Sequence, residues 1–142
     1  MTDARPLRGP TGPVRVPVKG GLAGWQIRRV QALAAGDLRG LDVPALAREV
    51  GLSPDHFRHA FLASVGQPPG RWLRERRIAT AKRLLHDPEL SVAAVARIVG
   101  YRGAPQLQRP FSESTGMSPL AWRRRHPAPG GPAPRYSADA ES

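Results

Sequence analysis

The sequence of 142 residues contains no cysteine. This absence excludes a disulfide-stapled scaffold, a cysteine nucleophile and a thiolate zinc site, and it is typical of proteins that work inside the cell. No apolar run approaches the roughly 18 residues that a membrane-spanning helix needs, and no apolar block follows the arginines near the N-terminus as in a secretory signal. We therefore predict a cytoplasmic protein without a membrane partner.

Acidic residues are scarce relative to basic ones. The chain has 22 Lys plus Arg against 11 Asp plus Glu, a formal net charge of +11, and most of this excess lies between Leu22 and His126. Nearly all of the basic residues are arginines, since only Lys19 and Lys82 are lysines. A fold with this excess is best tolerated when a polyanion shares its surface, so nucleic acid is the first partner to consider.

Motifs that carry common enzyme chemistry are also missing. The sequence has no Gly-x-x-x-x-Gly-Lys loop, no His-Glu-x-x-His motif, no serine elbow between glycines and no clustered pair of carboxylates. His56 and His59 lie on one predicted helix, but no cysteine or suitably spaced carboxylate completes a metal site with them. We expect neither an enzyme nor a metal or other cofactor.

Proline and glycine are concentrated at the two ends of the chain. Residues 1–21 and 127–142 are therefore predicted to be disordered. Between them the apolar residues recur with a helical period, and no alternating stretch is long enough for a strand, which predicts an all-α fold of about seven helices. We expect a first subdomain over residues 22–87 and a second over residues 88–126.

The most informative feature of the sequence is an internal repeat. Residues 43–77 read VPALAREVGLSPDHFRHAFLASVGQPPGRWLRERR, and residues 92–125 read VAAVARIVGYRGAPQLQRPFSESTGMSPLAWRRR. Up to Gly51 and Gly100 the copies align with an offset of 49 positions, and beyond the turn they align with an offset of 50. We interpret the repeat as two copies of one supersecondary unit, with one extra residue in the second turn.

Each copy has the parts of a helix-turn-helix. In the first copy Asp42 is placed to cap a short helix, and Gly51 permits the positive φ of a sharp turn. Ser53 and Pro54 then begin a second helix as its N-cap and its first residue. The corresponding cap and turn residues of the second copy are Ser91 and Gly100.

The second helix of each copy separates an inward side from an outward side. The residues predicted to point inward are Phe57 and Phe61 in the first copy and Leu107 and Phe111 in the second. The outward residues are Asp55, Arg58, His59 and Leu62 in the first copy and Gln106, Gln108 and Arg109 in the second. Arginine and glutamine can make bidentate contacts to guanine and adenine edges in the major groove, so these sides are candidate binding surfaces.

Two further helices are predicted around the repeats. Residues 71–86 form a linker helix that ends before Pro88, because a proline pushes the preceding residue out of the α region, and a rigid helix here would fix the separation of the two units. Its apolar stripe consists of Ile78, Ala81, Leu84 and Leu85. A first helix is expected to close the first core with Trp25, Ile27, Val30, Leu33 and Ala34. The aromatic residues at repeat-equivalent places, Phe61, Phe111, Trp72 and Trp122, are expected in the cores.

From about Leu22 to Arg125 the sequence resembles the DNA-binding domain of the AraC/XylS type. The residues that carry the resemblance are LAREVGLSPDHFRHAF, GQPPGRWLRERRIATAKRLL, DPELSVAAVARIVGY, LQRPF and TGMSPLAWRRR. The resemblance implies two helix-turn-helix subdomains joined by a linker helix. It also implies that their recognition helices enter successive major-groove segments on one face of the duplex, roughly 34 Å apart.

The resemblance further implies which residues contact DNA. The base-reading positions are Asp55, Arg58 and His59 in the first unit and Ala104, Pro105, Gln106, Gln108 and Arg109 in the second. The backbone-phosphate contacts are expected from Ser53, Arg71, Arg102 and Arg123. For the arginines, the alternative interpretation is a solvated or ion-paired helix face.

The second unit departs from the family pattern. Pro110 removes a backbone donor and crowds the preceding turn at a cost of about 3 kcal/mol, so we expect its recognition helix to be short or kinked. Gly103 is a poorer N-cap than Ser53. Leu62 and Ala63 in the first unit, and likewise Ser112 in the second, occupy positions where relatives often carry a basic residue near phosphates. These departures from the family pattern support base reading less well for the second unit than for the first.

The sequence thus predicts specific binding of double-stranded DNA and regulation of transcription, with activation rather than repression expected. We expect the protein to bind DNA as a monomer and to be associated with the nucleoid. RNA polymerase is a further candidate partner. Two alternatives stay open, namely a sequence-indifferent architectural DNA-binding protein and a protein-interaction module that docks on the transcription machinery. Relatives usually carry an additional sensing or dimerising domain, so the chain is either a minimal family member or the DNA-binding part of a longer regulator.

Overall fold

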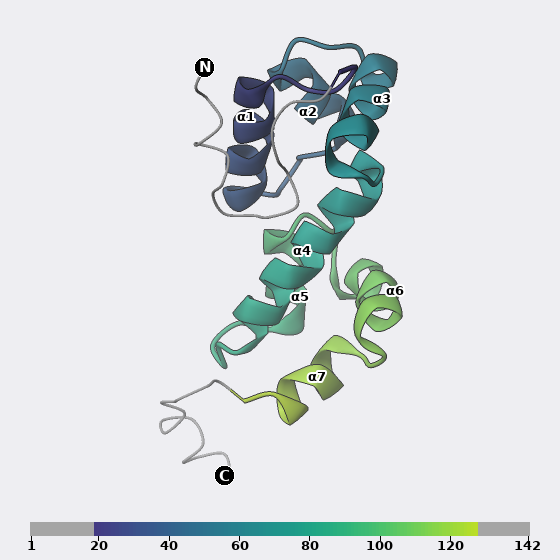
Figure 1. Ribbon diagram of the computed structural model, residues 1–142. Coiled ribbons are helices and arrows are strands. Elements are labelled where there is room, and N and C mark those ends of the chain that lie inside the picture. The colour runs from purple at the N-terminus through teal and green to yellow at the C-terminus, as the bar shows by residue number, and fades with distance from the viewer. Residues whose placement is uncertain (1–18, 128–142) are drawn as a thin grey trace. The chain divides into compact units, whose positions relative to one another are not determined.

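The computed structural model describes residues 19–127, which form seven helices (Figure 1). The helices are α1 (Gly24–Ala35), α2 (Val43–Glu49), α3 (Pro54–Val65), α4 (Pro69–Leu85), α5 (Val92–Ile98), α6 (Ala104–Thr115) and α7 (Pro119–Arg125). No strand occurs in this range, so the predicted all-α class and number of helices are confirmed. None of the helices described is both long and apolar enough to cross a membrane. Apart from their inner edges, the segments predicted to be disordered lie outside the described residues.

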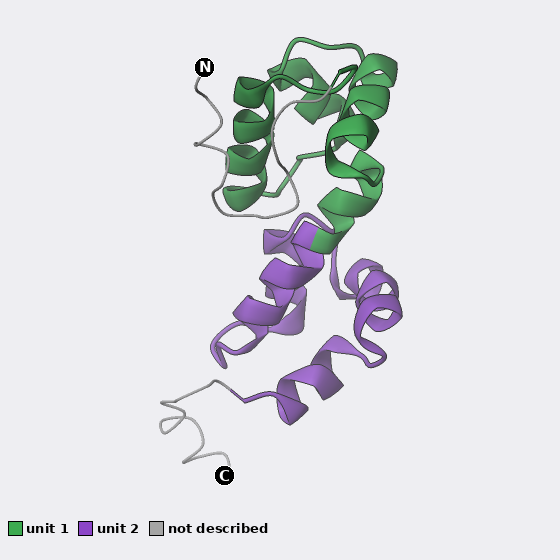
Figure 2. Ribbon diagram, viewed as in Figure 1, with its two compact units in different colours: residues 1–75 green, residues 76–142 purple. Residues whose placement is uncertain are grey.

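The chain divides into two compact units, with the boundary between Glu75 and Arg76 inside α4 (Figure 2). Unit 1 contains α1, α2, α3 and the first part of α4, and unit 2 contains the rest of α4 with α5, α6 and α7. In unit 1, α2 contacts both α1 and α3, and in unit 2, α6 contacts both α5 and α7. The α2–α3 and α5–α6 pairs are the two helix-turn-helix motifs predicted from the repeat, and α4 is the predicted linker helix.

Polar caps mark the beginnings of four helices. Asp42, Ser53, Ser91 and Ser118 each accept a hydrogen bond from the backbone N–H three residues later. Each side-chain oxygen thereby satisfies an N–H group that the first turn of a helix leaves without an intrahelical partner. The caps predicted for α2, α3 and α5 are confirmed.

Glycines make the sharp turn of each helix-turn-helix motif. Gly51 has a φ of 75° and Gly100 a φ of 105°, in the left-handed region where a Cβ atom is disfavoured. The turn spans residues 50–53 in unit 1 and residues 99–103 in unit 2. The predicted one-residue insertion therefore lies in the second turn.

The apolar sides of the helices form the two cores. The predicted inward residues Phe57, Phe61, Leu107 and Phe111 are at most 1% exposed. Phe61 contacts Trp72 with ring centroids 5.3 Å apart, and the equivalent Phe111 contacts Trp122 at 6.1 Å, both edge-on. Such pairs stabilise a core beyond the apolar area that they bury, and the prediction that all four aromatics are core residues is confirmed.

The prediction that Trp25 closes the first core is wrong. Its side chain is 54% exposed, whereas Ile27, Val30 and Ala34 of the same helix are buried. The buried stripe of α1 runs through positions spaced by three and four residues. Trp25 lies in the first turn and off this stripe, so the helix turns it outward.

The repeat extends further toward the N-terminus than residues 43–77 and 92–125, the two copies that the sequence predicts. Counterparts 51 positions apart are Ile27, Val30 and Ala34 in α1 and Ile78, Ala81 and Leu85 in α4, and all are buried. Gln26 of α1 donates from Nε2 to the backbone oxygen of Val50 at 3.0 Å. Its counterpart Arg77 donates from a terminal guanidinium nitrogen to the backbone oxygen of Val99 at 2.8 Å. In both units the helix that precedes the motif holds the carbonyl at the start of the turn.

Candidate nucleic-acid interface

The outward side of α3 carries the three residues predicted to read bases in unit 1. Asp55, Arg58 and His59 are all exposed, on the side of the helix opposite Phe57 and Phe61. Oδ1 of Asp55 lies 3.4 Å from a guanidinium nitrogen of Arg58. An ion pair this exposed contributes little to stability, so Arg58 can exchange Asp55 for a stronger partner.

His59 is held in place by its own helix. Its Nδ1 lies 3.0 Å from the backbone oxygen of Asp55. Because a carbonyl oxygen only accepts hydrogen bonds, this geometry assigns the hydrogen to Nδ1 and leaves Nε2 for a second partner. Leu62, one turn further along the helix, is 48% exposed on the same side.

The outward side of α6 carries the corresponding residues of unit 2. Pro105, Gln106, Gln108 and Arg109 are exposed, and Ala104 is half-buried. Nε of Arg109 lies 3.3 Å from Oε2 of Glu113, one turn toward the C-terminus, and the Arg109 side chain is 83% exposed. As in α3, the arginine is oriented by a weak intrahelical ion pair and remains accessible.

Pro110 does not shorten the recognition helix of unit 2. The helix α6 has 12 residues, as α3 does, and runs through Pro110, so the expectation of a short helix is wrong. Proline has no N–H, so the carbonyl of Gln106 loses the intrahelical donor that a helix normally supplies. The predicted weak N-terminus is confirmed, because Gly103 provides no side-chain cap.

Three of the four residues predicted to contact phosphates are exposed. Ser53 lies at the start of α3, where its hydroxyl caps the helix. Arg71 lies in the first turn of α4, with Nε 3.5 Å from a carboxylate oxygen of Glu75. Arg102 lies in the turn before α6. All three are accessible near the beginning of a helix, where backbone N–H groups also favour anions.

Arg123 has a different environment. Its guanidinium donates to the backbone oxygens of Leu85, Asp87 and Leu90, from Nε to the first and from one terminal nitrogen to the other two. These bonds join α7 to the last residue of α4 and to the segment that follows it. The guanidinium thus satisfies three carbonyls of the chain itself, a role that the sequence pattern did not indicate.

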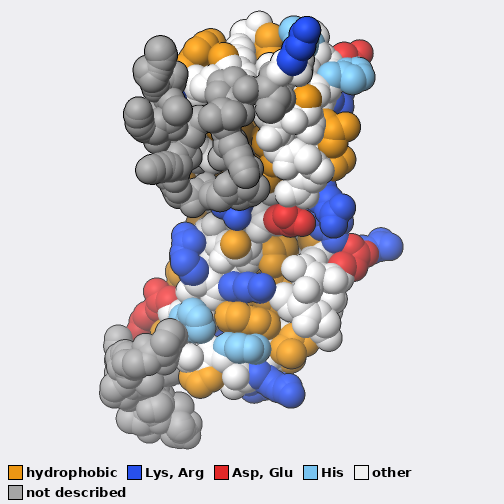
Figure 3. All heavy atoms as spheres, in the orientation of Figure 1, with side chains coloured by type: hydrophobic (Ala, Val, Ile, Leu, Met, Phe, Trp, Pro, Cys, Tyr) orange, Lys and Arg blue, Asp and Glu red, His pale blue; other side chains and the backbone are white. Residues whose placement is uncertain are grey.

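Basic side chains are spread over the visible surface, where acidic ones are fewer (Figure 3).

One acidic group outside the recognition helices is Asp37, in the loop between α1 and α2. The side chain of Arg39 donates hydrogen bonds to this carboxylate, and its backbone N–H adds another. These bonds hold the pKa of Asp37 below its usual value.

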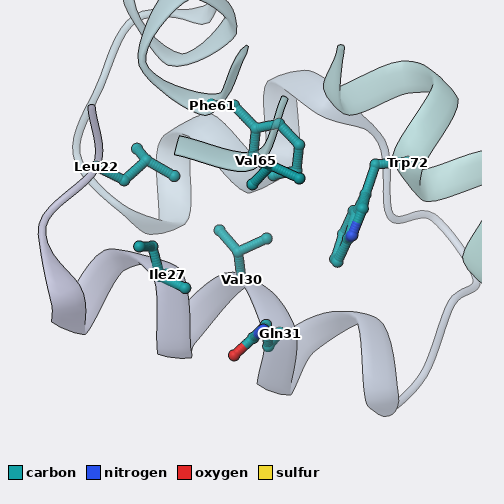
Figure 4. A pocket seen from close by; sticks show the side chains of 7 residues that line it. All are labelled: Leu22, Ile27, Val30, Gln31, Phe61, Val65 and Trp72. Carbon is teal, nitrogen blue, oxygen red and sulfur yellow. The ribbon is translucent and has the colours of Figure 1, made fainter. Parts of the chain in front are cut away.

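A small apolar cavity lies inside unit 1 (Figure 4). Its volume is about 10 Å³, which is the space of about one water molecule. The lining residues are Leu22, Ile27, Val30, Gln31, Phe61, Val65 and Trp72. The cavity is too small for a ligand of ordinary metabolite size. Within residues 19–127, no three His, Cys, Asp or Glu residues are grouped so that they could hold a metal ion.

Two helix-turn-helix motifs, each with a buried apolar side and an exposed polar side on its second helix, define a tandem helix-turn-helix domain. A family model described as a helix-turn-helix domain matches residues 46–125. The chain belongs to the AraC-type helix-turn-helix family of DNA-binding domains.

Two curated relatives are transcriptional regulators. The chain is 34% identical over 79 residues to the HTH-type transcriptional regulator Rv1931c of Mycobacterium tuberculosis, a match that covers 56% of this chain and 30% of that protein. It is 35% identical over 85 residues to the MmsAB operon regulatory protein of Pseudomonas aeruginosa, covering 60% of this chain and 28% of that protein. The chain thus spans less than a third of either relative.

One similar solved structure is the DNA-binding domain of the global transcriptional factor AdpA in complex with a target DNA. The identity is 30% and the TM-score is 0.66. The similarity covers 71% of this chain and 92% of that domain. The resemblance therefore extends over nearly the whole of a domain that has been crystallised on DNA.

Proposed function

We propose that this chain binds double-stranded DNA at specific sequences and regulates transcription, with α3 and α6 as recognition helices in successive major-groove segments. The observation that carries the proposal is the two-sided character of both helices. Phe57 and Phe61 are buried in α3, as Leu107 and Phe111 are in α6, so the opposite polar sides are exposed. The proposal requires that both polar sides meet one duplex.

The base contacts come from the exposed sides of the two helices. The proposed base-reading residues are Asp55, Arg58 and His59 of α3 and Ala104, Pro105, Gln106, Gln108 and Arg109 at α6. The proposed phosphate contacts are Ser53, Arg71 and Arg102. Arg123 is left out of this set because three backbone carbonyls of unit 2 engage its guanidinium.

The regulatory action proposed for the chain is activation in the cytoplasm, through contact with RNA polymerase. Two readers in one chain allow it to act on DNA as a monomer. The net charge of +11 supports a second candidate, a sequence-indifferent architectural protein, because charge alone attracts any duplex. An enzymatic activity is not proposed, since the family is one of DNA-binding domains.

The test is a comparison of affinities at two salt concentrations. A duplex selected from a random library and a scrambled duplex of the same composition are titrated with the full chain. A specific reader keeps a ratio of roughly 10³ or more between them, while both affinities fall as salt rises. Equal affinities for the two duplexes at both salt concentrations would favour the architectural alternative.

A further inference from the structure

The two recognition helices carry their acidic residues at opposite ends. In α3 the acidic residue is Asp55, in the first turn, with Oδ1 3.4 Å from Arg58. In α6 it is Glu113, in the last turns, 3.3 Å from Arg109. In the repeat, the counterpart of Asp55 is Pro105. The acid therefore precedes the arginine in α3 and follows it in α6.

This placement matters because the N-terminal residues of a recognition helix reach the base edges. A carboxylate only accepts hydrogen bonds, and the donors in the major groove are the amino groups of cytosine and adenine. The adenine amino group lies beside the N7 acceptor, which repels a carboxylate, whereas the cytosine edge presents only the donor. A guanidinium only donates and is matched by O6 and N7 of guanine.

We propose that α3 reads cytosine through Asp55 and guanine through Arg58 at the same or neighbouring base pairs. The half-site of unit 1 therefore requires G·C pairs. In α6 no acid precedes Arg109, and the amides of Gln106 and Gln108 match N6 and N7 of adenine, so the half-site of unit 2 combines adenine with guanine. Asp55 is the residue that separates the two preferences. This inference rests on the proposed function.

The side-chain geometry of α3 supports this assignment. The Asp55 side chain is 92% exposed and that of Arg58 is 51% exposed, so both can reach a groove. At 3.4 Å the two side chains lie next to each other as a weak, exposed ion pair, so the carboxylate and the guanidinium can each turn to a neighbouring donor or acceptor group on DNA. A purely structural role for Asp55 would be to stabilise the N-terminus of α3 through the helix dipole, and that role predicts no base preference.

The test is selection from a random duplex library with the full chain and two variants. Asp55→Asn keeps the size of the side chain and adds donors that suit adenine. Asp37→Asn is the matched control, since it removes the same charge in the loop between α1 and α2, where Asp37 contacts Arg39. In the Asp55→Asn selection, the cytosine preference in one half-site falls about tenfold in favour of adenine while the other half-site is unchanged. The control keeps both half-sites.

Three outcomes decide the inference, with circular dichroism confirming that the variants are folded. An Asp55→Asn consensus identical to that of the unmodified chain overturns it and leaves the proposed function standing, with Asp55 as a helix-stabilising residue. A consensus altered equally by Asp37→Asn also overturns it, because the effect is then one of net charge. The absence of any consensus for the unmodified chain overturns the inference and the proposed function together.

Discussion

Unit 1 and unit 2 are built alike inside and differ on their outward sides. Both cores contain an edge-on aromatic pair, Phe61 with Trp72 and Phe111 with Trp122. In both, a side chain from the preceding helix holds the carbonyl at the turn. The outward residues at equivalent positions of α3 and α6 differ in chemical type, as Asp55 and Pro105 do. Packing and buried hydrogen bonding constrain the interior, whereas the exposed sides are free to take on different chemistry.

The units also differ in how their recognition helices are stabilised. The helix α3 begins at a Ser53 cap, whereas α6 begins at Gly103 without a side-chain cap and contains Pro110. Unit 2 has contacts of another kind around α7, where Arg123 binds three backbone carbonyls and Trp122 stacks on His126 with ring centroids 4.3 Å apart. Local signals favour α3, whereas α6 lacks a side-chain cap, contains Pro110 and is anchored to its core by Leu107 and Phe111.

Truncation of the central aromatic is expected to have the largest effect and to remain within one unit. Phe61→Ala and Phe111→Ala should each lower the free energy of unfolding by about 3–5 kcal/mol, because each ring is fully buried and leaves a cavity. Hydrogen exchange followed by mass spectrometry should show loss of protection in unit 1 for the first variant and in unit 2 for the second. Equal loss of protection in both units with either variant would show that the two are one cooperative core.

Exchange of the residues at the Pro110 position tests the difference between the recognition helices. Ala60 is the counterpart of Pro110 and is 1% exposed. Ala60→Pro should destabilise unit 1 by about 3 kcal/mol or more, since it removes a helical hydrogen bond and crowds the preceding turn. Pro110→Ala should stabilise unit 2 by about 1 kcal/mol, because the restored bond is partly offset by the greater freedom of the unfolded chain. Urea denaturation measures both, and a destabilised Pro110→Ala chain would contradict the account.

The hydrogen bonds at the two turns should differ in strength. Arg77 donates to Val99 with a charged group and lies 5.7 Å from the ring of Tyr101, whereas Gln26 donates to Val50 with a neutral amide. Arg77→Ala should cost about 2 kcal/mol of stability, because charged donors make stronger bonds. The bond from Gln26 to Val50 should contribute about 1 kcal/mol, and Gln26→Ala also removes the bond that Gln26 Oε1 accepts from the backbone N–H of Ala23.

The control for this pair is Arg83→Ala, a truncation of an exposed arginine on the same helix as Arg77. Its effect should stay within about 0.5 kcal/mol. Thermal unfolding of the three variants gives the comparison. A loss for Arg77→Ala no larger than that for Arg83→Ala would mean that the bond to the turn contributes nothing.

The smallest expected effect is at the N-caps. Ser53→Gly should lower the stability of unit 1, and Gly103→Ser should raise that of unit 2, each by about 0.3 kcal/mol, since serine exceeds glycine as a cap by only a few tenths. Gly103 has the extended φ of −172° that serine adopts freely, and an added Cβ would come no closer than 3.5 Å to Gln106 Oε1. The midpoints of urea denaturation should shift in opposite directions, and shifts of the same sign would contradict the comparison.

The features predictable from the sequence are those that neighbouring residues determine. The caps at Ser53 and Ser91, the turn at Gly51 and the inward pair Phe57 and Phe61 follow from spacing and backbone preference, and the structure confirms them. The clamp of Arg123 joins residues up to 38 positions apart, and nothing local in the sequence indicates which carbonyls it meets. The prediction for Trp25 is wrong because an apolar residue in the first turn of a helix need not lie on the buried stripe of that helix.

One missed feature had a usable signal. The helix that precedes each motif repeats with an offset of 51 positions, which pairs Gln26 with Arg77. Gln26 and Arg77 differ in charge, and two of the three buried apolar pairs, Val30 with Ala81 and Ala34 with Leu85, differ in size, so identity alone does not reveal the correspondence. The common spacing of the buried residues in α1 and α4 would have shown it.

The most direct test of two readers on one duplex is hydroxyl-radical footprinting with Arg58→Ala and Arg109→Ala on the selected duplex. The unmodified chain should protect two segments separated by about one helical turn, roughly 10 base pairs. Each variant should lose protection in a different segment, and its binding free energy should be weaker by about 1–3 kcal/mol. Loss of the same segment in both variants, or a single protected segment with the unmodified chain, would contradict the account.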